Sequence, residues 1–384
     1  MGKSRLVLAV SGEPQTKEMI RKSLAMANYQ VSFISSIMEI NEAIMAFKPV
    51  ALVQDWDSVS ESQARQFHYK FSDKEASEGL LRVIISKNVS PQLKIFAKDA
   101  LIDDVMSFSN AKLNLGQELD RLFFIQNNSP LHDLLKSIKK NNQNYNQQEV
   151  DNKIEEAIKM FPDETNVQLE FGGLCLRRKN MKECQKQSSL VLHKEPGNLR
   201  ALNLMARAFM KSGDYLQAKD ILEKANLLSP QNPKRLMLLG DAFYGSGDLD
   251  GALDCYQQAK DLDSDLTLDS DQKSGKILLE QGEIDQAVEL FKSSVSQDEA
   301  ASIFNNVAVA AVKEGSYDSA LELYSTALKA LKTDESHKVQ IFFNISLCYY
   351  RMQDMKLASK YVKKSLRLDP SFKKAKDLSE RLAA

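Results

Sequence analysis

The strongest constraint on the fold is a period of 34 residues in the C-terminal two-thirds of the chain. Three segments align without gaps: LCLRRKNMKECQKQSSLVLHKEP, AFMKSGDYLQAKDILEKANLLSP and AFYGSGDLDGALDCYQQAKDLDS. Each contains two stretches with the apolar spacing of a helix, and each second stretch has a small residue at the same place: Cys184, Ala218 or Ala252. One such unit cannot bury its apolar face alone, so the units must stack into an array.

The pattern of small and large residues resembles the tetratricopeptide repeat (TPR), a unit of two helices. In the unit that starts at Leu199, the family's signature positions fall on Ala206, Phe209, Gly213, Ala218, Leu222, Ala225 and Pro230. Later units keep the glycine and the small residue as Gly282 with Ala287, and as Gly315 with Ala320. The resemblance implies an all-α right-handed superhelix with a concave groove lined by the first helix of each unit.

We expect seven TPR units within residues 131–372, followed by a capping helix at 373–384. Their expected ranges are 131–164, 165–198, 199–232, 233–266, 268–300, 301–334 and 339–372. The segment 123–130 is expected to be the junction with the preceding domain and to be too short for a flexible tether. A strand beyond residue 130 would contradict the repeat assignment.

Residues 1–127 have a different sequence pattern, in which short apolar runs alternate with helical stretches. The runs are LVLAV (6–10), VSFI (31–34), VALV (50–53), RVII (82–85) and DVM (104–106). This alternation predicts a parallel sheet covered by helices on both faces. The chain is therefore expected to be multidomain, with an α/β domain of flavodoxin-like (βα)5 fold before the repeats. In such sheets the functional crevice lies at the carboxyl ends of the strands.

The segments VLAVSGEPQTKEMIRKSLAMANYQVSFISS, KPVALVQD and RVIIS resemble the receiver domain of bacterial two-component signalling. The resemblance places Asp55 at the phosphoacceptor position and Ser86 at the hydroxyl position. The family's acidic pair after the first strand is replaced by Ser11-Gly12, and its lysine after the fifth strand by Ser107 or Phe108. We therefore expect a pseudo-receiver with an inactive Asp55 and no cofactor, since magnesium is needed only if the domain is active.

An alternative for this domain stays open. Glu13, Asp55 and Asp57 are candidates for a shifted metal site, in which Lys87 replaces the missing lysine. In that case the chain is a phosphorylation-gated response regulator whose repeats provide the protein-binding output.

The predicted groove of the repeats is rich in basic and amide side chains. Its candidate ligand residues are Arg200, Asn203, Arg207, Lys211, Lys234, Lys273, Lys276, Asn305, Asn306, Asn344 and Arg351. Such a lining favours a protein or peptide that is acidic or carries a free carboxylate. Solvation of exposed helix faces is the alternative explanation for any single lysine among them.

Composition limits the partners further. The formal net charge of −1 gives no global field for nucleic acid, and no apolar run is long enough for membrane insertion. The four cysteines are scattered, as expected for a reducing cytoplasm, and their spacing does not suggest a zinc site.

The resulting hypothesis is a non-enzymatic cytoplasmic signalling adaptor of bacterial type, with signalling, motility or polarity proteins as its partner classes. Besides the phosphorylation-gated regulator, an assembly or secretion chaperone is the second alternative.

Overall fold

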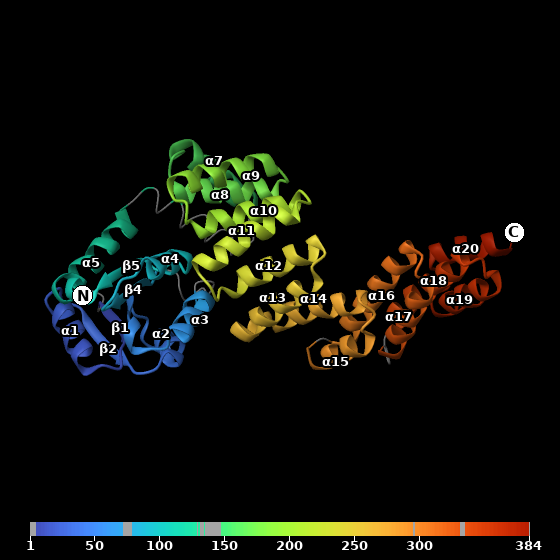
Figure 1. Ribbon diagram of the computed structural model, residues 1–384, viewed down its shortest axis with the longest axis horizontal. Coiled ribbons are helices and arrows are strands. Elements are labelled where there is room, and N and C mark those ends of the chain that lie inside the picture. Colours follow the sequence, from blue (N-terminus) through green and yellow to red (C-terminus); the bar gives the residue numbers. More distant parts are fainter. Residues whose placement is uncertain are drawn as a thin grey trace. The chain divides into compact units, whose positions relative to one another are not determined.

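The computed structural model describes residues 5–71, 79–128, 130, 134, 147–294, 296–330 and 335–383 (Figure 1). The chain divides into two compact units, Met1–Asp263 and Ser264–Ala384. The first unit combines an α/β sheet domain with helical repeats, and the second unit consists of helices.

The predicted five-stranded parallel sheet is confirmed. Its strands pair in the order β2-β1-β3-β4-β5. The strands are β1 (Leu6–Val10), β2 (Gln30–Ile34), β3 (Ala51–Asp55), β4 (Leu81–Ser86) and β5 (Asp104–Ser107). Every residue of β3 and β4 is buried, which explains why both strands read as short apolar runs. The order is that of open doubly wound sheets, so the carboxyl ends of β1 and β3 meet at the point where the strand order reverses.

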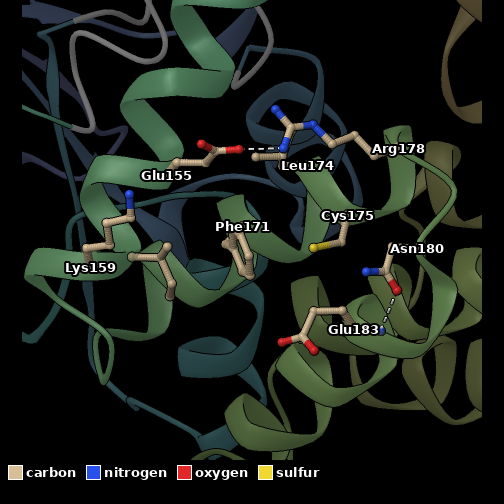
Figure 2. A pocket seen from close by; sticks show the side chains of 9 residues that line it. Glu155, Lys159, Phe171, Leu174, Cys175, Arg178, Asn180 and Glu183 are labelled. Atoms are coloured by element: carbon tan, nitrogen blue, oxygen red, sulfur yellow. Dashed lines mark hydrogen bonds and ion pairs between the residues drawn. The ribbon is translucent and has the colours of Figure 1, made fainter.

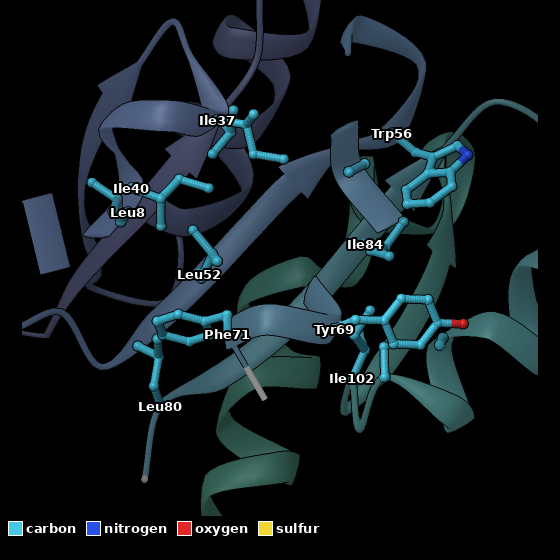
Figure 3. Close-up of a cluster of buried hydrophobic side chains, with 14 of the residues drawn as sticks. Leu8, Ile37, Ile40, Leu52, Trp56, Tyr69, Phe71, Leu80, Ile84 and Ile102 are labelled. Carbon is cyan, nitrogen blue, oxygen red and sulfur yellow. The ribbon is translucent and has the colours of Figure 1, made fainter. Parts of the chain in front are cut away.

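Successive strand residues point to opposite faces of the sheet, and each face has its own helices. Val7, Ala9 and Val53 pack under α1 (Pro14–Ala25) and α5 (Phe108–Asn128). Leu8, Leu52 and Ile84 pack with apolar residues from the opposite layer, including Ile40 and Phe71 (Figure 3). Phe96 belongs to the same cluster. That layer consists of η1 (Ile37–Glu39), α2 (Ile40–Phe47), η2 (Trp56–Ser58), α3 (Glu61–Phe71) and α4 (Pro91–Asp99).

The rest of the first unit is a series of consecutive helices. They are α7 (Gln147–Met160), α8 (Thr165–Arg177), α9 (Met181–Lys194), α10 (Leu199–Lys211), α11 (Tyr215–Leu228), α12 (Pro233–Ser246) and α13 (Leu249–Leu262). Asparagine or aspartate side chains cap several of them; Asp214, for example, accepts from the backbone N–H of Gln217. Small residues allow close approach within a helix pair, since a Cβ atom on Gly240 would lie 2.5 Å from Cε1 of Tyr256.

The second unit continues with the same kind of helix pairs. Its elements are η4 (Ser264–Leu266), α14 (Thr267–Glu280), α15 (Ile284–Ser294), α16 (Gln297–Glu314), α17 (Tyr317–Ala330), α18 (Glu335–Arg351), α19 (Met355–Leu368) and α20 (Lys373–Ala383). Ala287 and Ala320 lie in the core of the first two pairs, and Ala375 and Leu378 of α20 pack on Phe343 of the third.

Helices α7 to α13 lie within the expected repeat ranges, and α20 lies within the expected cap. Helices α14, α16 and α18 begin one to four residues before their expected units. The described residues after 130 contain no strand. The expected first helix of the 131–164 unit falls almost entirely outside the described residues, so the unit boundaries stay a prediction. At the expected junction, α5 continues as a helix to Asn128. No helix in the described parts of the chain is both long and apolar enough to cross a membrane.

Candidate functional site

The carboxyl ends of β1, β3 and β4 bring Ser11, Asp55 and Ser86 to one edge of the sheet, as the sequence predicted for parallel strands. Asp55 is the last residue of β3 and only 2% exposed. The Ser11 hydroxyl donates to Asp55 Oδ2 over 2.8 Å. The residue that replaces the first acid of the receiver pattern is therefore a hydrogen-bond donor to Asp55.

Asp57 lies one turn further along and is held by the loop after β4. The backbone N–H of Lys87 donates to Asp57 Oδ2 over 2.6 Å, and the Ser86 hydroxyl lies 3.2 Å from Oδ1. The same hydroxyl lies 3.1 Å from the carbonyl oxygen of Asn88. Asp57 thus ties the loop after β3 to the loop after β4.

Lys87 forms an ion pair across this edge. Its ammonium lies 3.0 Å from both carboxylate oxygens of Glu13, and both side chains are exposed. The carboxylate raises the pKa of Lys87, chiefly through these hydrogen bonds, while Asp57 and Asp55 act on it at longer range. The end of β5, where the receiver pattern has a lysine, holds Ser107 and Phe108. Lys87 is therefore the residue at this edge that is the candidate to replace that lysine.

Burial raises the pKa of Asp55, because a charged carboxylate is poorly solvated at this position. The hydrogen bond from the Ser11 hydroxyl opposes this shift, and the negative charges of Asp57 and Glu13 add to it. The edge therefore favours the protonated form of Asp55 more than water does.

The alternative of a metal site at Glu13, Asp55 and Asp57 is not supported. Among the described residues, no group of three or more histidine, cysteine, aspartate or glutamate side chains is placed to hold an ion. The physical reason is that each carboxylate has another partner: Lys87 for Glu13, Ser11 for Asp55, and the loop after β4 for Asp57. The residues present do not fit magnesium, which prefers several free oxygen ligands.

A second polar cluster lies where the sheet domain meets the repeats of the first unit. We call it the Asp99 cluster; its members are Asp99, Tyr69, Ser229, Asn232 and Arg235. Arg235 Nη2 and Nη1 lie 2.9 and 3.3 Å from the two oxygens of Asp99, and the two side chains are 0% and 3% exposed. The Tyr69 hydroxyl donates to Asp99 Oδ2 over 2.8 Å, and Asn232 donates to the same oxygen over 3.1 Å.

The hydrogen bonds of this cluster are mutually consistent. Because the Tyr69 hydroxyl donates its hydrogen to Asp99, its oxygen acts as the acceptor for Ser229 Oγ at 2.7 Å. Arg235 also donates to the backbone carbonyl of Ser229. Burial raises the pKa of Tyr69, and the charge of Asp99 adds to that shift. The phenol therefore stays protonated and remains a donor.

More exposed contacts surround the cluster. Lys70 lies 3.1 Å from Asp263, and Lys98 lies 3.2 Å from Glu195. The Gln66 amide donates to the carbonyl of Leu262. Sequence reasoning missed this interface, whose described contacts run through α3 and α4.

The interface and the Asp55 edge lie at opposite edges of the sheet. Tyr69 and Asp99 are near the ends of α3 and α4, and each helix returns from the carboxyl end of one strand to the start of the next. Asp99 therefore lies near the amino ends of the strands, whereas Asp55 lies at a carboxyl end. The repeats of the first unit contact the sheet domain without covering Asp55 at this interface.

The candidate groove residues of the first unit differ in their surroundings. Arg200 pairs with Glu170 at 3.0 Å and donates to Asn166 at 3.2 Å. Arg207 and Lys211 are exposed on the same helix, α10, and Asn203 is partly buried there. Lys234 is exposed at the start of α12, beside the buried Arg235.

The candidate groove residues of the second unit are more involved in internal contacts. Asn344 is 8% exposed; its amide donates to Asn305 Oδ1 over 2.9 Å, and its oxygen accepts from Gln340. Arg351 donates to the carbonyl of Val312, and Lys276 lies 3.7 Å from Glu280. Lys273 is partly buried, and Asn306 is exposed on α16. A ligand role for these residues stays a prediction.

A pocket of about 480 Å³ lies among α7, α8 and α9 (Figure 2). Phe171, Leu174 and Cys175 contribute its apolar surface, and Arg178 pairs with Glu155 at its border. Burial raises the pKa of the Cys175 thiol, so this cysteine is not an activated nucleophile. All four cysteines of the chain are buried free thiols.

Family models of the tetratricopeptide repeat match residues 209–270 and 299–371. The predicted repeats are therefore confirmed over these two stretches, one reaching from α10 to α14 and the other from α16 to α19. A TPR repeat-containing protein of Pseudomonas aeruginosa is 28% identical over 107 residues. The match covers 28% of this chain and only 18% of that protein.

Several solved structures are also similar to parts of the chain. A MamA fragment of Desulfovibrio magneticus is 18% identical, with a TM-score of 0.37, over 43% of this chain and 93% of that one. The APC/C heterotetramer Cut9-Hcn1 is 18% identical, with a TM-score of 0.42, over 84% and 60%. A tetratricopeptide repeat protein of Parabacteroides merdae is 11% identical, with a TM-score of 0.43, over 66% and 99%. These TM-scores are too low to assign a function.

Proposed function

We propose that the chain is a non-catalytic cytoplasmic signalling adaptor, in which a degenerate receiver domain is joined to repeats that hold a protein partner. The strand order β2-β1-β3-β4-β5 is shared by flavodoxin-like domains, and the position of Asp55 at the carboxyl end of β3 supports the receiver resemblance. Tetratricopeptide repeats generally mediate protein–protein interactions, which supports the adaptor role. The buried free thiols agree with a reducing compartment.

The single observation that carries the proposal is the Asp99 cluster. A guanidinium and a carboxylate that are both almost fully buried join the sheet domain to the α11–α12 region of the repeats. Such a contact holds the two parts as one body and leaves the Asp55 edge uncovered at that interface. Two accessible surfaces on one rigid frame are what an adaptor needs.

The inactive state of the receiver edge is supported by its local contacts. Ser11 occupies a position where receivers carry a metal-binding acid, and its hydroxyl binds Asp55. Glu13 lies one residue after the acidic pair of the receiver pattern, and its carboxylate is bound by Lys87. The edge can therefore serve as a recognition surface without a phosphoryl-transfer step.

The repeats are proposed to take an acidic peptide or one with a free carboxylate. Arg207 and Lys211 lie four residues apart on α10, so both side chains point to the same side of that helix. Their exposure and their common face make them the strongest candidates of the first unit, and the exposed Asn306 is the strongest of the second.

A fluorescent poly-glutamate peptide with a free carboxylate tests this binding, with a poly-glutamine peptide of equal length as its control. Arg207→Ala and Asn306→Ala should each weaken poly-glutamate binding by more than about tenfold, since a charged ligand group then loses its partner. Lys224→Ala, an exposed lysine on the second helix α11, is the matched control and should bind like wild type. Equal binding by all four proteins would exclude the groove as the binding site.

Phosphorylation at Asp55 is the second candidate, favoured by the nearby Lys87 ammonium, whose pKa the charge of Asp55 helps to raise. Intact-mass measurement after incubation with a small phosphodonor and magnesium separates the two proposals. We expect no change in mass. A stoichiometric gain of one phosphoryl group that disappears in Asp55→Asn would instead establish the phosphorylation-gated regulator.

A further inference from the structure

The second helices of the repeats in the second unit carry a regular pattern of surface charge. Each has a fully buried alanine: Ala287 in α15, Ala320 in α17 and Ala358 in α19. A helix turns about 100° per residue, so residues two before and two after such an alanine point away from the core, on the opposite side of the helix. These two positions lie four residues apart and form one small surface patch per repeat.

The charge at these equivalent positions reverses along the unit. In α15 the two positions carry Asp285 and Glu289, and in α17 they carry Asp318 and Glu322. In α19 they carry Lys356 and Lys360. All six residues are exposed. At these two positions the outward side of the second helices is therefore acidic on α15 and α17 and basic on α19; further along α17, the exposed Lys329 adds one positive charge.

The basic half extends beyond the two equivalent positions. Lys363, Lys364 and Arg367 follow on the same side of α19, and this helix contains no acidic residue. Lys364 lies over the rings of Phe342 and Tyr361. Among the described residues, no ion pair joins Lys356, Lys360 or Arg367 to a carboxylate, so these charges are not neutralised within the chain.

The overall charge of the chain hides this separation, because 51 basic and 52 acidic residues nearly cancel to a net charge of −1. A surface patch with one acidic half and one basic half is complementary to itself after a rotation of 180°. The acidic complement that α19 requires is thus already present on the same side of the same unit.

We propose that this patch, made of α17 and α19 with α15 at its border, binds a second copy of the chain about a two-fold axis. Asp318 and Glu322 of one copy face Lys356 and Lys360 of the other, and the reverse pair forms at the same time. Exposed ion pairs are individually weak and are screened by salt, so the association is reversible and depends on ionic strength. The Asp99 cluster lies in the first unit and takes no part in it.

Sedimentation equilibrium of the full chain tests the proposal, with wild type compared at low and high ionic strength. At about 0.01 M salt, where charges act over about 30 Å, we expect dimers; at about 1 M salt, where the range is about 3 Å, we expect monomers. The double variants Lys356→Glu/Lys360→Glu and Asp318→Lys/Glu322→Lys should each raise the dimer dissociation constant at least tenfold at low salt, because like charges then face each other.

Mixing the two double variants gives the decisive measurement. Each fails to pair with itself, but the reversed lysines of one match the reversed carboxylates of the other, so an equimolar mixture should form heterodimers. The matched control is Lys373→Glu/Lys374→Glu on α20, which changes the net charge equally outside the patch and should dimerise like wild type.

Three results would overturn the proposal: a monomeric wild type at low salt at every soluble concentration, dimers that persist in both double variants, or a mixture that stays monomeric. Circular dichroism of each variant verifies folding, which exposed substitutions should preserve. A monomeric wild type that binds an acidic protein through Lys356 and Lys360 would assign the basic half to that other partner.

Discussion

Asp55 and Asp99 are two buried carboxylates of the same domain, and they are satisfied in different ways. Asp55 is 2% exposed and accepts a hydroxyl hydrogen bond from Ser11, while the nearby Lys87 pairs with Glu13. The Asp99 side chain is 3% exposed and accepts hydrogen bonds from a guanidinium, a phenol and an amide. A buried carboxylate paired with a cation can join two parts of a chain, whereas one that has only hydroxyl partners marks a place where ionisation is unfavourable.

The largest expected effect comes from breaking the pair at Asp99. Arg235→Ala leaves the buried carboxylate without its cation and should lower the free energy of unfolding by about 3–5 kcal/mol. Urea unfolding followed by circular dichroism measures this loss.

A matched control for that variant lies on the same helix as Asp99. Lys98→Ala removes an ion pair to Glu195 in which the lysine is 73% exposed, and it should cost less than about 1 kcal/mol. If Arg235→Ala costs no more than Lys98→Ala, the Asp99 cluster does not hold the sheet domain on the repeats.

A smaller effect of opposite sign is expected at Asp55. The raised pKa means that the native state binds this proton more tightly than the unfolded chain, in which the pKa has its ordinary value near 3.8. Ionised Asp55 therefore destabilises the native state at neutral pH, and this loss fades as the pH falls toward 3.8. Asp55→Asn should raise the melting temperature at pH 7, with a gain that shrinks as the pH approaches 4.

Asp57→Asn provides the contrast for the Asp55 variant. The Asp57 carboxylate accepts from the Lys87 backbone N–H at 2.6 Å, a charge-assisted bond that a neutral amide replaces only with a weaker one. We expect no stabilisation at pH 7 from this change. A gain equal to that of Asp55→Asn would mean that general charge repulsion at this edge, and not the burial of Asp55, causes the effect.

The smallest expected effect concerns Lys87. Lys87→Ala removes an exposed ion pair with Glu13, which water and salt already screen. The melting temperature should stay within experimental error of wild type at physiological salt. A clear loss of stability would show that the Lys87–Glu13 pair closes the Asp55 edge more firmly than its exposure suggests.

The parts of the fold that the sequence predicted are those set by local periodicity. Apolar runs such as LVLAV predicted the strands, and the 34-residue period predicted the helix pairs around Ala218 and Ala252. The place of Asp55 at a strand end followed in the same way, because the end of an apolar run marks the edge of the sheet.

The Asp99 cluster could not be predicted, because its partners are 136 residues apart and each looks ordinary in its own segment. In the sequence, Asp99 is typical of a polar residue at the end of a helix. Arg235 follows Lys234, so it resembles a solvent-exposed residue in the first turn of the next helix pair. The amide of Asn344 posed the same problem, since its bond to Asn305 depends on how two helices pack. Long-range pairing of polar groups leaves no periodic signal along the chain.

The separation of 136 residues between Asp99 and Arg235 also sets an order of events during synthesis. Ribosomes add about 5–20 residues per second and domains fold in turn from the amino terminus, so Arg235 is made roughly 7–27 s after Asp99. During that interval Tyr69 and Asp99 form a solvent-exposed surface on a nascent sheet domain. Because that surface is polar, it is compatible with water until Arg235 is made. An exposed apolar surface of the same size would be more prone to aggregation.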